Sequence, residues 1–168
     1  MANTKMSELG ETPQRSGGDE ELIPVLGDTA ALAGMMVGLL DTGKVVPIDA
    51  DSATLGISFI GIMDRHPTVD YDTIVGDGIL NNAMVPKSGR KYDCFVEDMT
   101  TIGKKGVPLT FSVTTAGSLV MVANASSLGT LNNTLVIDDT VDILAQPIVA
   151  YLDEDIATGD LVAHIRWA

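Results

Sequence analysis

The residues best suited to chemistry begin with a stretch that resembles a phosphate-binding loop. The run from Gly38 to Val45 reads GLLDTGKV, and in such loops backbone N–H groups and a lysine hold the phosphates. The residue after the lysine must be Ser or Thr to bind magnesium, but here it is Val45. A helix must also follow, and the VVP after Lys44 is typical of a strand. We therefore predict a hairpin turn at Gly43 and Lys44 rather than a nucleotide site.

Two candidate nucleophiles, Ser58 and Cys94, also lack the surroundings that catalysis needs. In the pattern Gly56-x-Ser58-x-x-Gly61 the second glycine comes one residue too late for the sharp turn that exposes a hydrolase serine. Cys94 lies in an alternating apolar run, and a free cysteine there is usually buried as a small apolar residue. The sequence therefore predicts neither an enzyme nor a bound cofactor.

The possible metal ligands are equally sparse. His66 and His164 are the only histidines, whereas a zinc site needs three or four well-placed ligands, and Asp64 would supply only a third. Asp49 and Asp51 begin a segment like a calcium loop, but the next oxygen ligand and the closing Glu are missing. We predict no metal site, and only a weak surface cation among the 23 Asp and Glu residues is left open.

Composition and charge narrow the class of protein. The net charge is −13, and the only adjacent basic pairs are Arg90-Lys91 and Lys104-Lys105. A nucleic-acid surface needs clustered Lys and Arg, so binding to nucleic acid or to an anionic membrane is not expected. The longest apolar run, residues 30–40, is too short to span a membrane. The first residues lack the apolar region of a signal peptide, which predicts synthesis in a cytoplasm.

Short apolar runs separated by glycine-rich turns predict a mainly β fold. Hydrophobic residues make up 45% of the chain and 17 residues are glycines, which suits many short strands better than long helices. We expect a compact β-sandwich or β-barrel of about ten short strands with little helix. The expected strands occupy 22–26, a part of 30–40, 44–48, 54–63, 91–97, 107–113, 118–122, 135–137, 141–144, 148–152 and 161–167, and one or two more fall within 69–89.

The domain organisation follows from where the apolar runs begin. Residues 1–22 are polar and poor in large apolar groups, so they are predicted to form an extended N-terminal arm. Residues 23–168 are predicted to form a single β-domain. A weak internal similarity links TGKVV at residues 42–46 with AGSLV at 116–120, preceded by Gly34 and Gly103 respectively. It is too short to establish a repeat.

The end of the chain reads as a closing hairpin. Residues 148–152 alternate as a strand, the acidic run 153–155 breaks it, and residues 161–167 form the last strand. We interpret the acidic run as a solvated turn that protects a strand edge from wrong pairing. Trp167, the only tryptophan, either plugs the β-domain or anchors a subunit contact, because tryptophan is enriched at binding hot spots.

The order of these motifs resembles the small β-rich head-decoration, or cement, proteins of tailed viruses. A polar arm precedes short β-segments, the middle carries Leu55-Gly56-Ile57 and Ile60-Gly61, and the end reads AQPIVA, ATGDLVA and a late Trp. In such families an Ala/Thr-Gly-Asp-x-Val turn precedes a late strand, as residues 158–162 do here. The resemblance covers most of residues 23–168, but residues 69–91 match no part of it.

The resemblance implies a structural virion protein that is synthesised in the host cytoplasm and carried on the outer capsid surface. Such a protein would bridge major capsid subunits as a homotrimer and stabilise the icosahedral shell. The expected oligomer or capsid contacts are Leu9, Pro13, Leu22, Ile23 and Trp167. Two alternatives remain: another oligomeric structural or adhesive particle component, such as a tail or fibre protein, and an enzyme whose site is shared between subunits.

Overall fold

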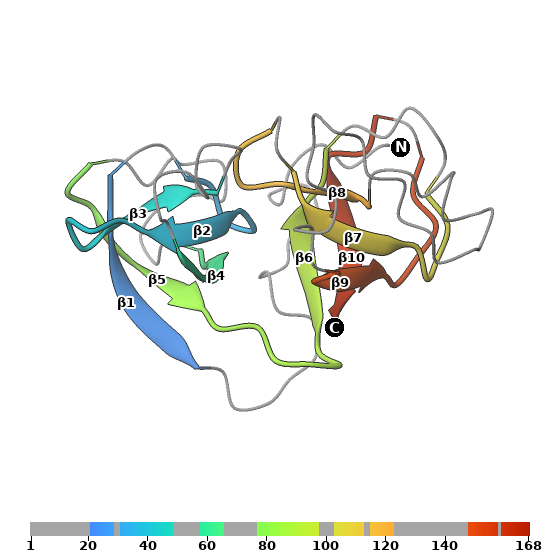
Figure 1. The fold of residues 1–168 in the computed structure, drawn as a ribbon, viewed down its shortest axis with the longest axis horizontal. Coiled ribbons are helices and arrows are strands. Elements are labelled where there is room, and N and C mark those ends of the chain that lie inside the picture. The colour runs from blue at the N-terminus through green and yellow to red at the C-terminus, as the bar shows by residue number, and fades with distance from the viewer. Residues whose placement is uncertain are drawn as a thin grey trace, which may run out of the picture.

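The computed structural model describes residues 21–28, 31–48, 58–65, 77–97, 103–112, 115–122, 148–157 and 159–168, which form ten strands and no helix (Figure 1). The strands are β1 (Leu22–Gly27), β2 (Met36–Leu39), β3 (Lys44–Pro47), β4 (Ser58–Met63), β5 (Leu80–Met84), β6 (Lys91–Phe95), β7 (Pro108–Phe111), β8 (Leu119–Met121), β9 (Ala150–Leu152) and β10 (Val162–Trp167). The predicted mainly β fold is confirmed. Residues 1–20 of the predicted arm (1–22) and the predicted strands at 135–137 and 141–144 lie outside the described residues, and Leu22 belongs to β1.

The first half of the chain closes into a barrel with the strand order β1-β3-β2-β4-β5. β1 pairs in parallel with β3 and antiparallel with β5, and the remaining neighbours are antiparallel. Pro24 lies opposite Asn82 of β5, whereas β3 pairs with β1 only at Leu26 and Gly27. The proline therefore occupies a point where β1 is paired on one side, which its missing N–H requires.

The second half forms a five-stranded sheet in the order β6-β10-β9-β7-β8. A single parallel bridge between Val96 and Leu119 joins the segments at its two edges. The predicted hairpin of β7 and β8 and the predicted pairing of β9 with β10 are both confirmed. Figure 1 shows this sheet beside the first barrel, with the C-terminal strand β10 next to β6.

The two halves have the same topology, strand for strand. Starting from β6 and crossing the bridge, the second sheet reads β6-β8-β7-β9-β10, which matches β1-β3-β2-β4-β5. The one parallel contact falls at the same place, and the other pairs are antiparallel in both halves. The described part of the chain is therefore an internally duplicated fold.

Equivalent hydrogen bonds fix the alignment of the two halves. The amide of Gly34 donates to the carbonyl of Met63 at 2.8 Å, and the amide of Gly106 donates to Leu152 at 2.8 Å. Both glycines are left-handed, with φ of 88° and 89°, a conformation that a Cβ disfavours. Gly34 thus corresponds to Gly106 rather than to Gly103, the residue with which the weak sequence similarity aligned it.

The hairpin turns correspond as the sequence suggested. Gly43, before β3, and Gly117, before β8, have φ of 81° and 75°. The segments TGKVV and AGSLV therefore occupy the same place in the two halves, with Val45 and Leu119 both making the parallel contact to the first strand of their half. The weak sequence similarity between residues 42–46 and 116–120 therefore reflects a structural repeat.

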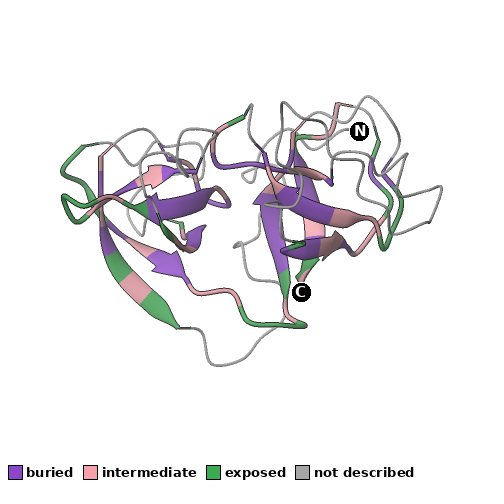
Figure 2. Ribbon diagram, viewed as in Figure 1, coloured by how far each residue is buried: buried purple, intermediate pink, exposed green. Residues whose placement is uncertain are grey.

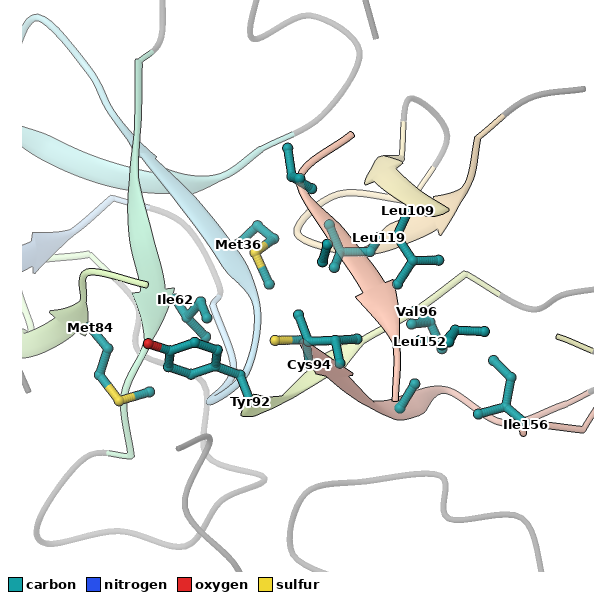
Figure 3. Packing of buried hydrophobic residues seen from close by; sticks show 14 residues of the cluster. Met36, Ile62, Met84, Tyr92, Cys94, Val96, Leu109, Leu119, Leu152 and Ile156 are labelled. Carbon is teal, nitrogen blue, oxygen red and sulfur yellow. The ribbon is translucent and has the colours of Figure 1, made fainter. Parts of the chain in front are cut away.

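The two halves share an apolar core. A smaller cluster fills the first barrel: Val25, Ala31, Val37, Val45, Met63 and Ala83. A larger cluster joins three residues of the first barrel, Met36, Ile62 and Met84, to the interior of the second sheet, including Tyr92 and Cys94 (Figure 3). Figure 2 shows the buried segments of both sheets facing this junction. Burying such side chains contributes roughly 1.5–3 kcal/mol each.

Hydrogen bonds and aromatic rings reinforce the junction. The carbonyl of Gly117 accepts from the amide of Met36 at 2.8 Å, and the amide of Gly117 donates to the carbonyl of Ile48 at 2.6 Å. Phe59 of β4 stacks on Trp167 of β10 with ring centroids 5.5 Å apart and planes at 15°. The last strand of the second sheet is thereby fastened to the first barrel.

Because Phe59 and Trp167 belong to different halves, their stacking should appear as a coupling energy. In a double-mutant cycle of Phe59→Leu and Trp167→Leu, we expect the double variant to lose about 0.5–1.5 kcal/mol less unfolding free energy than the sum of the two single variants. Urea unfolding of the four proteins measures this. Strict additivity would show that the rings contribute separately to their own halves.

Candidate functional site

The residues most like a catalytic constellation gather on the second sheet. Asp93 of β6 and His164 of β10 are opposite each other in the strand pairing, and the Asp93 carboxylate contacts His164 Nδ1. On the other side of the ring, Glu154 Oε1 lies 3.2 Å from Nε2. Asp93 is fully buried, and the side chain of His164 is 16% exposed. Strand pairing thus brings together residues that are 71 positions apart in sequence.

This arrangement uses the imidazole as a structural link between two carboxylates. A histidine that serves as a general base must present one nitrogen to the substrate while the other is oriented by a partner. Here Asp93 takes one nitrogen and Glu154 takes the other. The geometry therefore supports a role in holding β6, β10 and the β9–β10 turn together.

Cys94 sits next to Asp93 in sequence but points into the apolar core. It is fully buried, which confirms the prediction of a small buried residue. Burial, and secondly the charge of Asp93, raise the pKa of its thiol well above the usual value. The reactive thiolate form is consequently disfavoured.

Lys44, the lysine of the phosphate-loop-like stretch, is held by carboxylates. Its Nζ lies 2.6 Å from Asp77 and 3.4 Å from Asp28, and it opens β3 directly after the Gly43 turn. The predicted hairpin between β2 and β3 is confirmed. The hydrogen bond from Lys44 lowers the pKa of Asp77.

Strand packing explains the Gly56-x-Ser58-x-x-Gly61 pattern that resembles a hydrolase serine turn. Ser58 is the exposed first residue of β4. A Cβ on Gly61 would lie 2.4 Å from the carbonyl oxygen of Met84, so the close approach of β4 and β5 requires glycine there. This strand contact, rather than a sharp catalytic turn, accounts for Gly61.

Two residues of the acidic run 153–155, Asp153 and Asp155, pair with lysines. Glu154 and Asp155 are 43% and 56% exposed, as a solvated turn predicts, whereas Asp153 is largely buried. Asp153 lies 2.6 Å from Lys91 and 3.7 Å from Lys105, and its side chain is only 17% exposed. Asp155 contacts Lys104 at 2.8 Å and also accepts the backbone N–H of Lys105 at 2.9 Å. The hydrogen bonds from Lys91 and Lys104 lower the pKa values of Asp153 and Asp155 respectively. Lysine side chains thus compensate these carboxylates.

The remaining candidate metal ligands are not brought together by the described structure. Asp64 follows β4 in the first barrel, whereas His164 contacts Asp93 and Glu154 on the second sheet. His66, Asp49 and Asp51 lie outside the described residues. Among the residues that the structure describes, no group of three or more His, Cys, Asp and Glu side chains is placed to hold a metal ion.

The predicted contact residues fall into three situations. Leu9 and Pro13 lie outside the described residues. Ile23 packs against the core of the first barrel, and Trp167 is partly buried against Phe59 at the junction. Leu22 is 42% exposed, so it alone of the described three presents a large part of its side chain at the surface.

Sequence reasoning missed the apolar surface to which Leu22 belongs. Successive residues of a strand point to opposite faces, so Leu22, Pro24 and Leu26 share the outer face of β1. On neighbouring β5, Leu80 lies opposite Leu26 and is 66% exposed. Exposed apolar residues gathered on one surface, unlike isolated ones, indicate an interaction site. The signal in the sequence was the strand LIPVLG, which is apolar on both faces.

No family model matches the chain, and no curated protein matches it. The described residues contain no helix that is long and apolar enough to cross a membrane.

The lysine-bound acidic turn predicts loss of stability in acid. Because Lys91 holds the pKa of Asp153 below its usual value, the stabilisation is complete above the unfolded-state pKa of about 3.9 and is lost as pH falls through the lower folded-state pKa. At pH 7, Asp153→Asn should lower the unfolding free energy by roughly 1 kcal/mol.

Urea unfolding at pH 7 and at pH 3 measures the effect, and the difference between wild type and variant should shrink at pH 3. Asp41→Asn is the matched control, because it removes the same charge from an exposed turn between β2 and β3. Equal effects of the two substitutions at pH 7 would contradict a specific role of the Asp153 ion pairs.

Proposed function

We propose that the protein is a structural component of a virus particle. It decorates and stabilises the outer surface of an icosahedral capsid, where it bridges major capsid subunits as a homotrimer. The resemblance of its late Thr-Gly-Asp-Leu-Val turn and its closing strands to cement proteins suggests this role. The observation that carries the proposal is the outer face of β1 and β5, a largely apolar surface on a body of two fused β-units.

The physical demands of such a role suit this architecture. A protein that resists expansion of a shell needs a stiff body and several contacts, because linked contacts give high avidity from individually weak ones. The two halves supply the stiffness through their shared core and through the backbone hydrogen bonds at Gly117. His164 contacts both Asp93 and Glu154, which reinforces the body.

The net charge of −13 also fits binding from solution to a surface of opposite charge. Free copies repel each other and stay soluble, while a basic patch on a shell would attract them and raise the association rate. Such attraction weakens with salt, since charges more than about 8 Å apart are screened at physiological ionic strength. Binding is therefore expected to be faster at low salt.

Mixing the purified protein with capsids tests the proposal. The probe is a shell assembled from the major capsid protein encoded in the same genome, and light scattering gives the mass of the free protein. We expect a trimer in solution, added density on the shells in electron micrographs, and shells that resist heating better when decorated. A monomer that leaves the shells bare would contradict the proposal.

A further inference from the structure

We propose that the outer face of β1 and β5 is the capsid-docking surface, and that it binds a capsid patch that is apolar at its centre and basic at its rim. This inference rests on the proposed function and assigns its contact site. The face consists of Leu22, Pro24 and Leu26 on β1 with Leu80 and Asn82 on β5. Figure 2 shows exposed segments along β1.

The strand pairing makes this face continuous. Leu26 lies opposite Leu80, and Pro24 lies opposite Asn82, so their side chains project from the same side of the two strands. Leu22 lies opposite Met84, which is buried at the junction of the two halves. The apolar strip therefore begins beside the shared core and extends outward to Leu80.

The duplicated half shows that the fold does not require exposed leucines at these positions. In the alignment fixed by the hydrogen bonds, β6 corresponds to β1 and β10 to β5. Lys91 and Asp93 then occupy the positions of Leu22 and Pro24, and His164 occupies that of Asn82. The equivalent of Leu80 is Val162, which is buried. At these positions the second half exposes Lys91 and buries Asp93 and Val162, so exposed leucines are not a feature that the common fold requires.

Charges at both ends of the face indicate the chemistry of the partner. Glu21 precedes Leu22 at one end, and its carbonyl accepts the amide of Val85. At the other end Asp28 and Asp77 share Lys44, which leaves one net negative charge. A partner with basic residues around an apolar centre would complement this pattern.

A second copy of the chain fits the face less well. In a two-fold contact the Glu21 end of one copy would meet either the same end or the Asp28 and Asp77 end of the other, and both arrangements bring carboxylates together. Like charges across an interface disfavour the pairing. Face-to-face pairing of two copies is therefore disfavoured, and the proposed occupant is the capsid protein.

The test compares two double variants in binding to the same assembled shells. Leu22→Ser with Leu80→Ser removes the exposed leucines of the face and should weaken shell binding about tenfold or more, because the apolar area that these side chains would bury on the shell is lost. Leu39→Ser with Ile148→Ser is the matched control, since these residues are 41% and 45% exposed but lie elsewhere. The control should bind like the wild type, and both double variants should melt close to the wild-type temperature.

The outcomes separate the two proposals. Wild-type protein that fails to bind the shells would overturn the proposed function and the docking face together. Wild-type binding with equal binding by the Leu22/Leu80 variant would overturn the docking face alone. A Leu22/Leu80 variant that still binds shells but loses its trimer would reassign the face to contacts between copies.

Discussion

The packing of Met36, Ile62 and Met84 of the first barrel against the interior of the second sheet is the interaction on which the rest of the structure depends. The first barrel's own buried cluster consists of small and medium side chains around Val25 and Met63. Small units bury too little surface to be secure alone. By joining their cores, the two halves form one larger core, and the backbone bonds at Gly117 set the distance between them.

Within this shared framework the two halves have taken different surfaces. The common requirements are a left-handed glycine at Gly34 and Gly106, a second one at Gly43 and Gly117, and buried residues at the matching strand positions. At equivalent positions of the first and last strands, one half carries exposed leucines, whereas the other carries the largely buried Asp93–His164 pair. The duplication separates what the fold needs from what a surface does, which is why the apolar face is informative.

Most strands and hairpins could be predicted from the sequence, because they depend on residues that are close together in the chain. Alternating apolar runs and left-handed glycines marked most strands and the β2–β3 and β7–β8 hairpins. The short strand β5 was expected only loosely within the turn-rich segment 69–89. The lysine partners of Asp153 and Asp155 could not be predicted, because they come from distant turns and strands.

Long-range arrangement could not be predicted from the chain, because strand register depends on partners far away in sequence. No residue near His164 in the sequence indicates Asp93 as its partner, because only the pairing of β6 with β10 brings the two together. The duplication could not be recognised from sequence either. The two halves share the same strand register but differ in side chains, so that Leu22, for example, corresponds to Lys91. Trp167 was recognised as important, but its stacking on Phe59 required the position of the other half.

Hydrogen exchange in the native state tests most directly whether the two halves form one cooperative unit. The amides of Met63 and Leu152 make equivalent buried hydrogen bonds, to Met35 at 2.8 Å and to Val107 at 3.0 Å. A shared core predicts that both amides exchange only through global opening, with the same free energy and the same dependence on low urea concentrations. If one amide exchanges through a local opening of lower free energy while the other stays protected, the account is contradicted.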